Sequence, residues 1–257
     1  MTGSPTASAS PAALSMRNVS LTLGSGPNRT DALIDVNLDL APGELVAVTG
    51  RSGSGKSSLL NVAGGLIRPS SGSVTVGATD LAALSPAELS DARRTSIGYV
   101  FQDLNLIASL TAAENISLPL ELDGVSVSEA RASAATALAA VGLDGLDKRY
   151  PDELSGGQRQ RVAIARGLIG DRRLLLADEP TGALDEITAE SVMHLLRGQC
   201  DEGAATLFVT HDPSLAAWAD RVIRLRDGRI DAVSTRSNRI SAVDAAEGPT
   251  DPVEETA

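Results

Sequence analysis

Two kinds of apolar pattern along the chain predict two kinds of strand. Apolar and polar residues alternate at Val19, Leu21 and Leu23 and again over Ile34–Leu40, which predicts two half-buried antiparallel strands joined by a turn at Gly24–Asp31. Other runs are almost continuously apolar, as expected for parallel strands covered on both faces. These runs are Leu45–Thr49, Leu174–Ala177 and Thr206–Val209.

Helical patterns separate the buried runs. One helix is expected to begin at about Lys56, and the others are Pro86–Arg94, Val127–Val141, Gly157–Leu168, Ile187–Arg197 and Pro213–Trp218. This alternation predicts an α/β fold with a parallel sheet. The Ala-rich stretch from about Asp103 to Pro151 has helical character and no convincing buried strand, so it predicts an inserted helical subdomain.

Composition and charge narrow the class of partner. The 257 residues, 42% of them apolar, suffice for one core with a modest insertion. The net charge is −11 and aromatic residues make up 2% of the chain, so the field and the stacking platforms that bind nucleic acids are both missing. Nucleic acid is therefore not expected as a main partner.

The cysteine content and the chain ends indicate the compartment. Cys200 is the single cysteine, which favours a reducing interior, and no apolar run approaches the ~20 residues that cross a bilayer. Residues 1–13 lack a basic and an apolar signal segment, and residues 236–257 are acidic, so both are expected to be disordered tails. The chain is expected to stay in the cytoplasm, with its main domain at residues 14–235 and the helical subdomain at about 103–160.

A glycine-rich loop after the first buried strand points to phosphate binding. Gly50–Ser57 fits Gly-x4-Gly-Lys-Ser/Thr and lies where a strand passes into a helix. Its backbone N–H groups can surround a polyphosphate, Lys56 can reach the terminal phosphates, and the Ser57 hydroxyl can ligate Mg²⁺. The residues expected to bind nucleotide here are Gly50, Ser52, Gly53, Ser54, Gly55, Lys56, Ser57 and Ser58.

Acidic and polar residues follow three further strands. Asp178 and Glu179 end the run that begins at Leu174, and carboxyl ends of parallel strands are where open α/β sheets bind ligands. Asp178 is placed to hold Mg²⁺, and Glu179 to polarise the attacking water. His211 could donate to a terminal phosphate, and Gln102 could meet the metal or the water, although each alone would be an unremarkable residue at a strand end.

A second glycine pair opens another helix. Ser155 stands at an N-cap position before Gly156, Gly157 and Gln158. The exposed N–H groups and the helix dipole make such a start attractive to anions. Gly pairs are common in loops, so the segment gains weight only beside the phosphate loop.

These motifs together resemble the ATP-binding cassette (ABC) ATPases. The match runs from about Leu14 to Ser234 and rests on the order of six motifs. They are Gly50–Ser57, Gln102, Leu154–Gln158, Asp178–Glu179, Ala183–Asp185 and His211. Within that family, the segments Val100–Leu106, Leu110–Asn115 and Ala177–Asp185 are similar to the branch serving lipoprotein-releasing, macrolide-exporting and cell-division permeases.

The resemblance implies a fold, an activity and partners. It implies a P-loop NTPase (RecA-like) core with an antiparallel β subdomain and an inserted helical subdomain, and hydrolysis of ATP with Mg²⁺. It also implies a head-to-tail dimer in which Ser155, Gly156 and Gly157 of one copy close over the ATP of the other, with Asp185 at the seam. Gln102 and the segment after it would contact an integral membrane permease, which would hold the chain at the inner face of the cell membrane.

One position departs from the family, and one alternative stays open. The family usually stacks an aromatic residue on adenine, whereas this chain has Leu23 there, so the leucine face would pack on the base. Repair-type ABC ATPases are excluded by the lack of sustained heptads or a cysteine pair between Lys56 and Leu154, and GTPases by the lack of Asn-Lys-x-Asp. The permease served could be an exporter, or one that regulates signalling or cell-wall remodelling without cargo.

Overall fold

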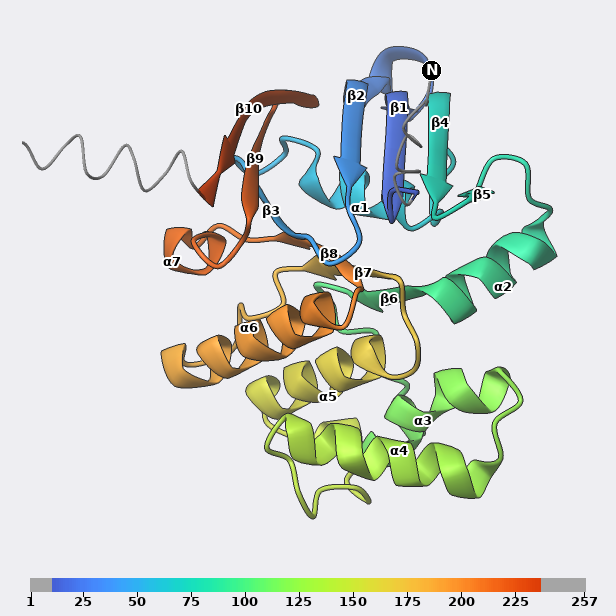
Figure 1. Cartoon of the computed structure of the whole chain (residues 1–257), viewed down its shortest axis with the longest axis vertical. Helices are drawn as coiled ribbons and strands as arrows, with labels where there is room; N and C mark the ends of the chain where they lie inside the picture. Colours follow the sequence, from blue (N-terminus) through green and yellow to red (C-terminus); the bar gives the residue numbers. More distant parts are fainter. Residues whose placement is uncertain (1–10, 237–257) are drawn as a thin grey trace, which may run out of the picture.

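The computed structural model describes residues 11–236, which form two sheets and the helices packed on them (Figure 1). The smaller sheet is antiparallel, in the order β2-β1-β4-β5. Its strands are β1 (Leu14–Leu23), β2 (Thr30–Leu40), β4 (Ser71–Val76) and β5 (Thr79–Asp80). The predicted first hairpin is present, but its turn is shorter than expected because Thr30 and Asp31 already pair with Leu23 and Thr22.

The larger sheet has the order β10-β9-β3-β8-β7-β6. All its neighbours are parallel except β10, which pairs antiparallel with β9. Its strands are β3 (Leu45–Thr49), β6 (Ile97–Val100), β7 (Leu174–Asp178), β8 (Ala205–Val209), β9 (Arg221–Arg226) and β10 (Arg229–Thr235). Strands β7 and β8 are buried at every position, as their continuous apolar runs predicted.

Helices cover both faces of the parallel sheet. The α-helices of the described residues are α1 (Lys56–Ala63), α2 (Pro86–Ser96), α3 (Ala112–Leu122), α4 (Val127–Ala140), α5 (Gly156–Leu168), α6 (Glu186–Asp201) and α7 (Pro213–Ala216). One core lies between the two sheets and includes α1, and a second lies between the parallel sheet and α5–α7. Of the helices in residues 11–236, none is long and apolar enough to cross a membrane.

A third cluster forms the end of the molecule opposite the antiparallel sheet, where α3 and α4 pack on α5 (Figure 1). Ile116, Leu138 and Val162 are fully buried there or nearly so. The structure thus contains the α/β core, the antiparallel sheet and the inserted helices that the sequence predicted. Helix α5 runs past residue 160 and reaches the parallel sheet, so the predicted subdomain limit falls inside a continuous helix. The predicted tails lie almost wholly outside the described residues.

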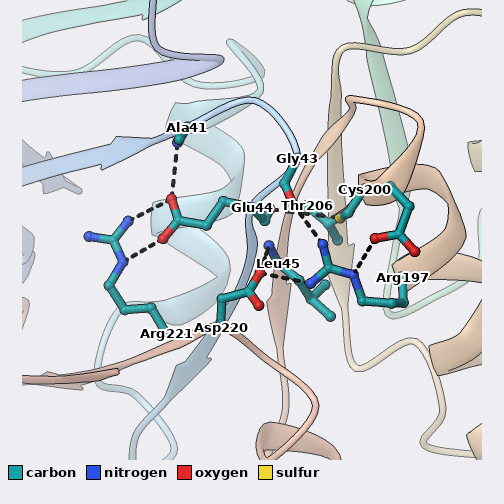
Figure 2. Close-up of polar contacts among 10 residues, drawn as sticks. Ala41, Gly43, Glu44, Leu45, Arg197, Cys200, Thr206, Asp220 and Arg221 are labelled. Atoms are coloured by element: carbon teal, nitrogen blue, oxygen red, sulfur yellow. Dashed lines mark hydrogen bonds and ion pairs between the residues drawn. The ribbon is translucent and has the colours of Figure 1, made fainter. Parts of the chain in front are cut away.

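An ion-pair network fastens the amino ends of β3 and β9 (Figure 2). Arg221 forms two hydrogen bonds with the Glu44 carboxylate, and Arg197 of α6 binds Asp220 and the carbonyl of Gly43. Asp220 also accepts from the backbone N–H of Leu45. The network therefore joins α6, β9 and the start of β3 at the edge opposite the loop that follows β3.

Candidate nucleotide site

The loop between β3 and α1 takes a shape that requires glycine at two positions. Gly50 and Gly55 have φ angles of 156° and 101°. A Cβ atom on Gly50 would lie 2.3 Å from the carbonyl oxygen of Leu225, and one on Gly55 the same distance from that of Ala32. The backbone therefore curls against its neighbours so closely that a side chain is excluded at both positions.

The polar side chains of Lys56 and Ser54 differ in their hydrogen bonds. The Lys56 ammonium donates to the carbonyls of Gly50 and Arg51 at 2.9 and 3.0 Å, so it lies folded over the loop. The Ser54 hydroxyl is buried and has no hydrogen-bond partner among the described residues. Buried polar groups are normally paired. The Lys56 ammonium also lines the cleft, where an anionic ligand could replace its loop carbonyls, whereas Ser54 does not line the cleft.

Asp178 lies at the end of β7 beside α1. Its side chain is mostly buried, and burial raises the pKa of its carboxyl, against an opposing hydrogen bond with the Ser57 hydroxyl. The Glu179 carboxylate raises that pKa further, and Lys56 lowers it. A buried carboxylate paired with a hydroxyl is a donor set of the hard oxygen type that Mg²⁺ takes. The residues present therefore fit a magnesium ion held next to bound phosphates.

Glu179 has a strained backbone and a specific partner. Its φ angle is 50°, an uncommon value for a residue with a side chain. Its carboxylate lies 3.0 Å from Nδ1 of His211, whose pKa is raised by that hydrogen bond and charge. Because the carboxylate can only accept when ionised, Nδ1 of His211 is the donor in this contact.

The predicted residues line two adjoining hollows. The larger, of about 560 Å³, brings together Leu23, Gly50, Ser52, Gly53, Gly55, Lys56, Ser57, Ser58, Gln102, Asp178, Glu179 and His211. The smaller, of about 360 Å³, shares Gln102, Glu179 and His211 with it. Leu23 is 41% exposed and lines the same cleft. The cleft is also lined by Thr30, Asp31 and Ala32 of β2. Sequence reasoning missed them because Thr30 and Asp31 fall within the predicted turn and Ala32 lies between that turn and the predicted strand.

The second helix start stands apart from this cleft. Ser155 is the N-cap of α5 and shares a capping box with Gln158, as its position in the sequence predicted. Gly156 is exposed, and a Cβ atom there would meet nothing within 4 Å. Neither these residues nor Gly157 nor Asp185, the N-cap of α6, lines the cleft in the part of the chain that the structure describes. Within one chain, the two groups of predicted site residues are not brought together.

Two polar residues of α5 that the sequence reasoning missed contact the loops of the site. Gln160 is 4% exposed and binds the backbone of Glu179 and Ala183. Arg166 donates to the carbonyls of Leu104 and Asn105, just after Gln102. In the sequence, these two residues differ from other polar residues only in lying on the face of the helix that packs inward. That face is known only after the helix has been placed on the sheet.

Comparison with known proteins assigns the family. Residues 33–182 match the sequence profile of the ABC transporter family. The chain is 42% identical over 226 residues to the macrolide export ATP-binding/permease protein MacB of Neisseria gonorrhoeae, covering 88% of this chain and 35% of that protein. For MacB of Mannheimia succiniciproducens the identity is 45% over 207 residues, covering 80% and 32%. The chain thus spans about a third of the length of these relatives.

Solved structures support the same family assignment. A dimeric, post-hydrolysis ATP-binding cassette, MJ0796, bound to ADP and Pi, superposes with a TM-score of 0.83 at 40% identity, covering 87% of this chain and 98% of that one. A second dimeric structure of the same cassette matches equally well. The chain belongs to the ABC transporter family, and it is an ATP-binding ATPase with the P-loop NTPase fold. The predicted family, fold and ATPase activity are confirmed.

Proposed function

We propose that two copies of this chain bind ATP between them, head to tail, and that hydrolysis drives an integral membrane permease. The observation that carries the proposal is the separation within one chain of a complete phosphate cleft and an anion-attracting helix start. The cleft covers a nucleotide from one side, and the exposed start of α5 at Ser155–Gly157 would cover it from the other chain. The solved structure of the MJ0796 cassette is dimeric, which supports the arrangement.

The predicted residues of the cleft each have a role in this proposal. Residues 50–58 hold the phosphates, with the Lys56 ammonium leaving its loop carbonyls for the terminal phosphates. The Leu23 side chain packs on adenine. Glu179 is the general base that orients the attacking water, and His211 keeps the Glu179 carboxylate in place and donates to the terminal phosphate.

Ser57, Asp178 and Gln102 would hold Mg²⁺, which neutralises the charge that develops on the phosphates when it is bound. For the chain itself, Ser57 at the start of α1 and Asp178 at the end of β7 line the same cleft. Gln102 comes from a different strand end, so its approach depends on the loop that follows β6.

The permease would dock in an apolar groove away from the cleft. This groove, of about 340 Å³, lies between α2, β6 and α3. Its apolar lining includes Tyr99, Phe101, Leu118, Pro119 and Leu122. The names of the MacB relatives join an ATP-binding part to a macrolide export permease, which supports export as the process served and a location at the inner face of the membrane.

Mixing two inactive variants tests the head-to-tail arrangement. Lys56→Ala removes the phosphate charge and Gly156→Asp places an anion at the helix start, where open space accommodates the side chain. In a mixed head-to-tail dimer, one site receives both defects and the other neither. A 1:1 mixture should therefore recover about a quarter of wild-type ATP hydrolysis, if dimers form at random.

The double variant is the matched control. Mixed with the wild-type chain, Lys56→Ala/Gly156→Asp should impair both sites of each mixed dimer and so inhibit the wild-type chain. If the loop and helix start of the same chain served one site, the two single variants would stay inactive when mixed, and the double variant would leave its wild-type partner's site active. That result would refute the proposed dimer.

A further inference from the structure

Three residues on the loops beside the cleft have left-handed backbones although they carry side chains. Leu104 and Asn105, in the loop after Gln102, have φ angles of 60° and 47°, and Glu179 has 50°. Such conformations are strained, above all for leucine, and persist when the surrounding structure holds them. The loops that position Gln102 and Glu179 therefore need a support outside themselves.

A single helix supplies contacts to all three carbonyl groups. The Arg166 guanidinium of α5 donates through Nη2 to the Leu104 oxygen and through Nη1 to the Asn105 oxygen, both at 2.6 Å. Gln160, on the same helix, donates through Nε2 to the Glu179 oxygen at 3.0 Å. Its Oε1 accepts from the Ala183 N–H at 2.8 Å, which closes the loop after β7.

Helix α5 can act as a support because it lies against the sheet. A Cβ atom on Gly98 of β6 would be 2.1 Å from the Gly167 oxygen, so the two backbones touch there. Arg166 precedes Gly167 in the chain, so this contact holds the backbone of Arg166 in place. Gln160 is 4% exposed and reaches the β7 end from within the packed interface. Both side chains therefore start from a fixed backbone.

We propose that Gln160 and Arg166 are positioning residues, which hold the Glu179 and Gln102 loops in the shape needed for hydrolysis and tie that shape to α5. The inference rests on the proposed function, because α5 begins at Ser155, which would face the nucleotide of the other chain. A shift of α5 as the helix start meets that nucleotide would then move the Glu179 and Gln102 loops of its own chain. The two nucleotide sites of the dimer would be coupled through this helix.

The expected effect is on turnover and not on nucleotide affinity. The phosphate loop rests on β3 and α1, and neither Gln160 nor Arg166 contacts it in the described hydrogen bonds. When a support is lost, the freed loop can relax toward right-handed geometry and carry its side chain out of place. Misplacement by about 1 Å can slow an enzyme about 100-fold.

The experiment compares α5 variants with a matched arginine. Arg166→Met removes both hydrogen bonds to the loop, and Arg166→Lys replaces the guanidinium by one ammonium group. Gln160→Met removes the amide at nearly constant side-chain volume. Arg161→Met is the control, because Arg161 also donates to two consecutive carbonyls, those of Val141 and Gly142, but in the helical subdomain. Thermal unfolding of each variant checks that it folds.

Three readouts are expected to separate positioning from a general structural role. Arg166→Met and Gln160→Met should lower kcat for ATP about 10- to 100-fold, with ATP affinity changed by less than about twofold. Arg166→Lys should recover part of the loss, and Arg161→Met should hydrolyse like the wild-type chain. Without nucleotide, amide exchange should quicken at Leu104 and Asn105 in Arg166→Met and at Gly182 and Ala183 in Gln160→Met.

Wild-type kcat and unchanged amide exchange in both Met variants would overturn this inference while leaving the proposed function intact. An equal loss in Arg161→Met would also overturn it, since the effect would then come from loosening α5 in general. Failure of the proposed function has a different signature, because the mixture of Lys56→Ala and Gly156→Asp would then recover no ATP hydrolysis.

Discussion

Leu23 lines the cleft and is the residue that we propose to pack on adenine. Its side chain ends β1, pairs across the hairpin with Thr30, and is 41% exposed beside the phosphate loop. A leucine face offers adenine dispersion contacts without aromatic stacking. Base stacking on an aromatic ring contributes about 1–3 kcal/mol in nucleic-acid complexes, so this position sets how much of the affinity for ATP comes from the base.

Leu23→Tyr is therefore expected to tighten ATP binding about 3- to 10-fold. The ring would stack on the base, and the exposed position leaves room for it. Titration with ATP, followed through the fluorescence of the new tyrosine and by calorimetry, measures the change. Leu23→Ala is the control and should weaken binding modestly. Equal affinities in all three proteins would show that adenine is held elsewhere.

At the scale of elements, the amino edge of the parallel sheet depends on charge pairs. Asp220 receives the Leu45 N–H at 2.9 Å and the Arg197 guanidinium at 2.7 Å (Figure 2). Burial alone would raise the pKa of Asp220, but these two hydrogen bonds, together with the charges of Arg197 and Arg236, outweigh it, and the pKa lies below its ordinary value of 3.8. A carboxyl with a lowered pKa in the folded chain stabilises the fold above its unfolded pKa, and this stabilisation is lost as the pH falls through the folded value.

Asp220→Asn should accordingly lower the free energy of unfolding by about 1 kcal/mol at pH 7, the size of a partly exposed ion pair. The difference in free energy of unfolding between the variant and the wild-type chain should decrease as the pH falls from about 5 to below the ordinary carboxyl pKa. Urea unfolding at several pH values measures it. Asp227→Asn serves as the control, because Asp227 is 93% exposed and 3.8 Å from Arg226. Parallel pH curves for wild type and Asp220→Asn would contradict the assignment.

The elements differ in how far the sequence predicted them. Strands β3, β7 and β8 were predictable because both faces are buried, which leaves a continuous apolar run. Strands β4, β9 and β10 were missed, since partly exposed strands such as β9, with arginines at 221, 224 and 226, carry no such run. Their place depends on pairing with distant strands that local pattern does not reveal.

The residues of the cleft also differ in how far the sequence predicted them. Residues at the carboxyl ends of parallel strands share one edge, so Gln102, Glu179 and His211 could be expected to meet, and they line the same hollow. Gln160 and Arg166 could not be found in this way. Their partners are backbone carbonyls up to 62 positions away, held in left-handed conformations that depend on tertiary packing.

For the whole molecule, the proposed cycle makes the dimer a consequence of bound ATP. Each chain carries a net charge of −11, so two copies repel at low ionic strength, and the contacts that both chains make with the bound nucleotide would have to outweigh this repulsion. If the ATP-bound state is the closed one, slowing hydrolysis should cause the dimer to accumulate. The Glu179 carboxylate is the group whose removal would do so without disturbing the phosphate loop.

Glu179→Gln should keep ATP binding, slow hydrolysis about 10²- to 10⁴-fold and accumulate an ATP-bound dimer, because the amide cannot accept the proton of the attacking water. Light scattering at about 0.15 M salt, where surface repulsion is screened within ~8 Å, should show the 26.3 kDa chain doubling in mass when ATP is added. With ADP it should remain a monomer, and adding Lys56→Ala should abolish the ATP effect. A Glu179→Gln chain that hydrolyses ATP at the wild-type rate, or that binds ATP and stays monomeric at all concentrations tested, would contradict a cycle in which ATP closes the dimer and its cleavage opens it.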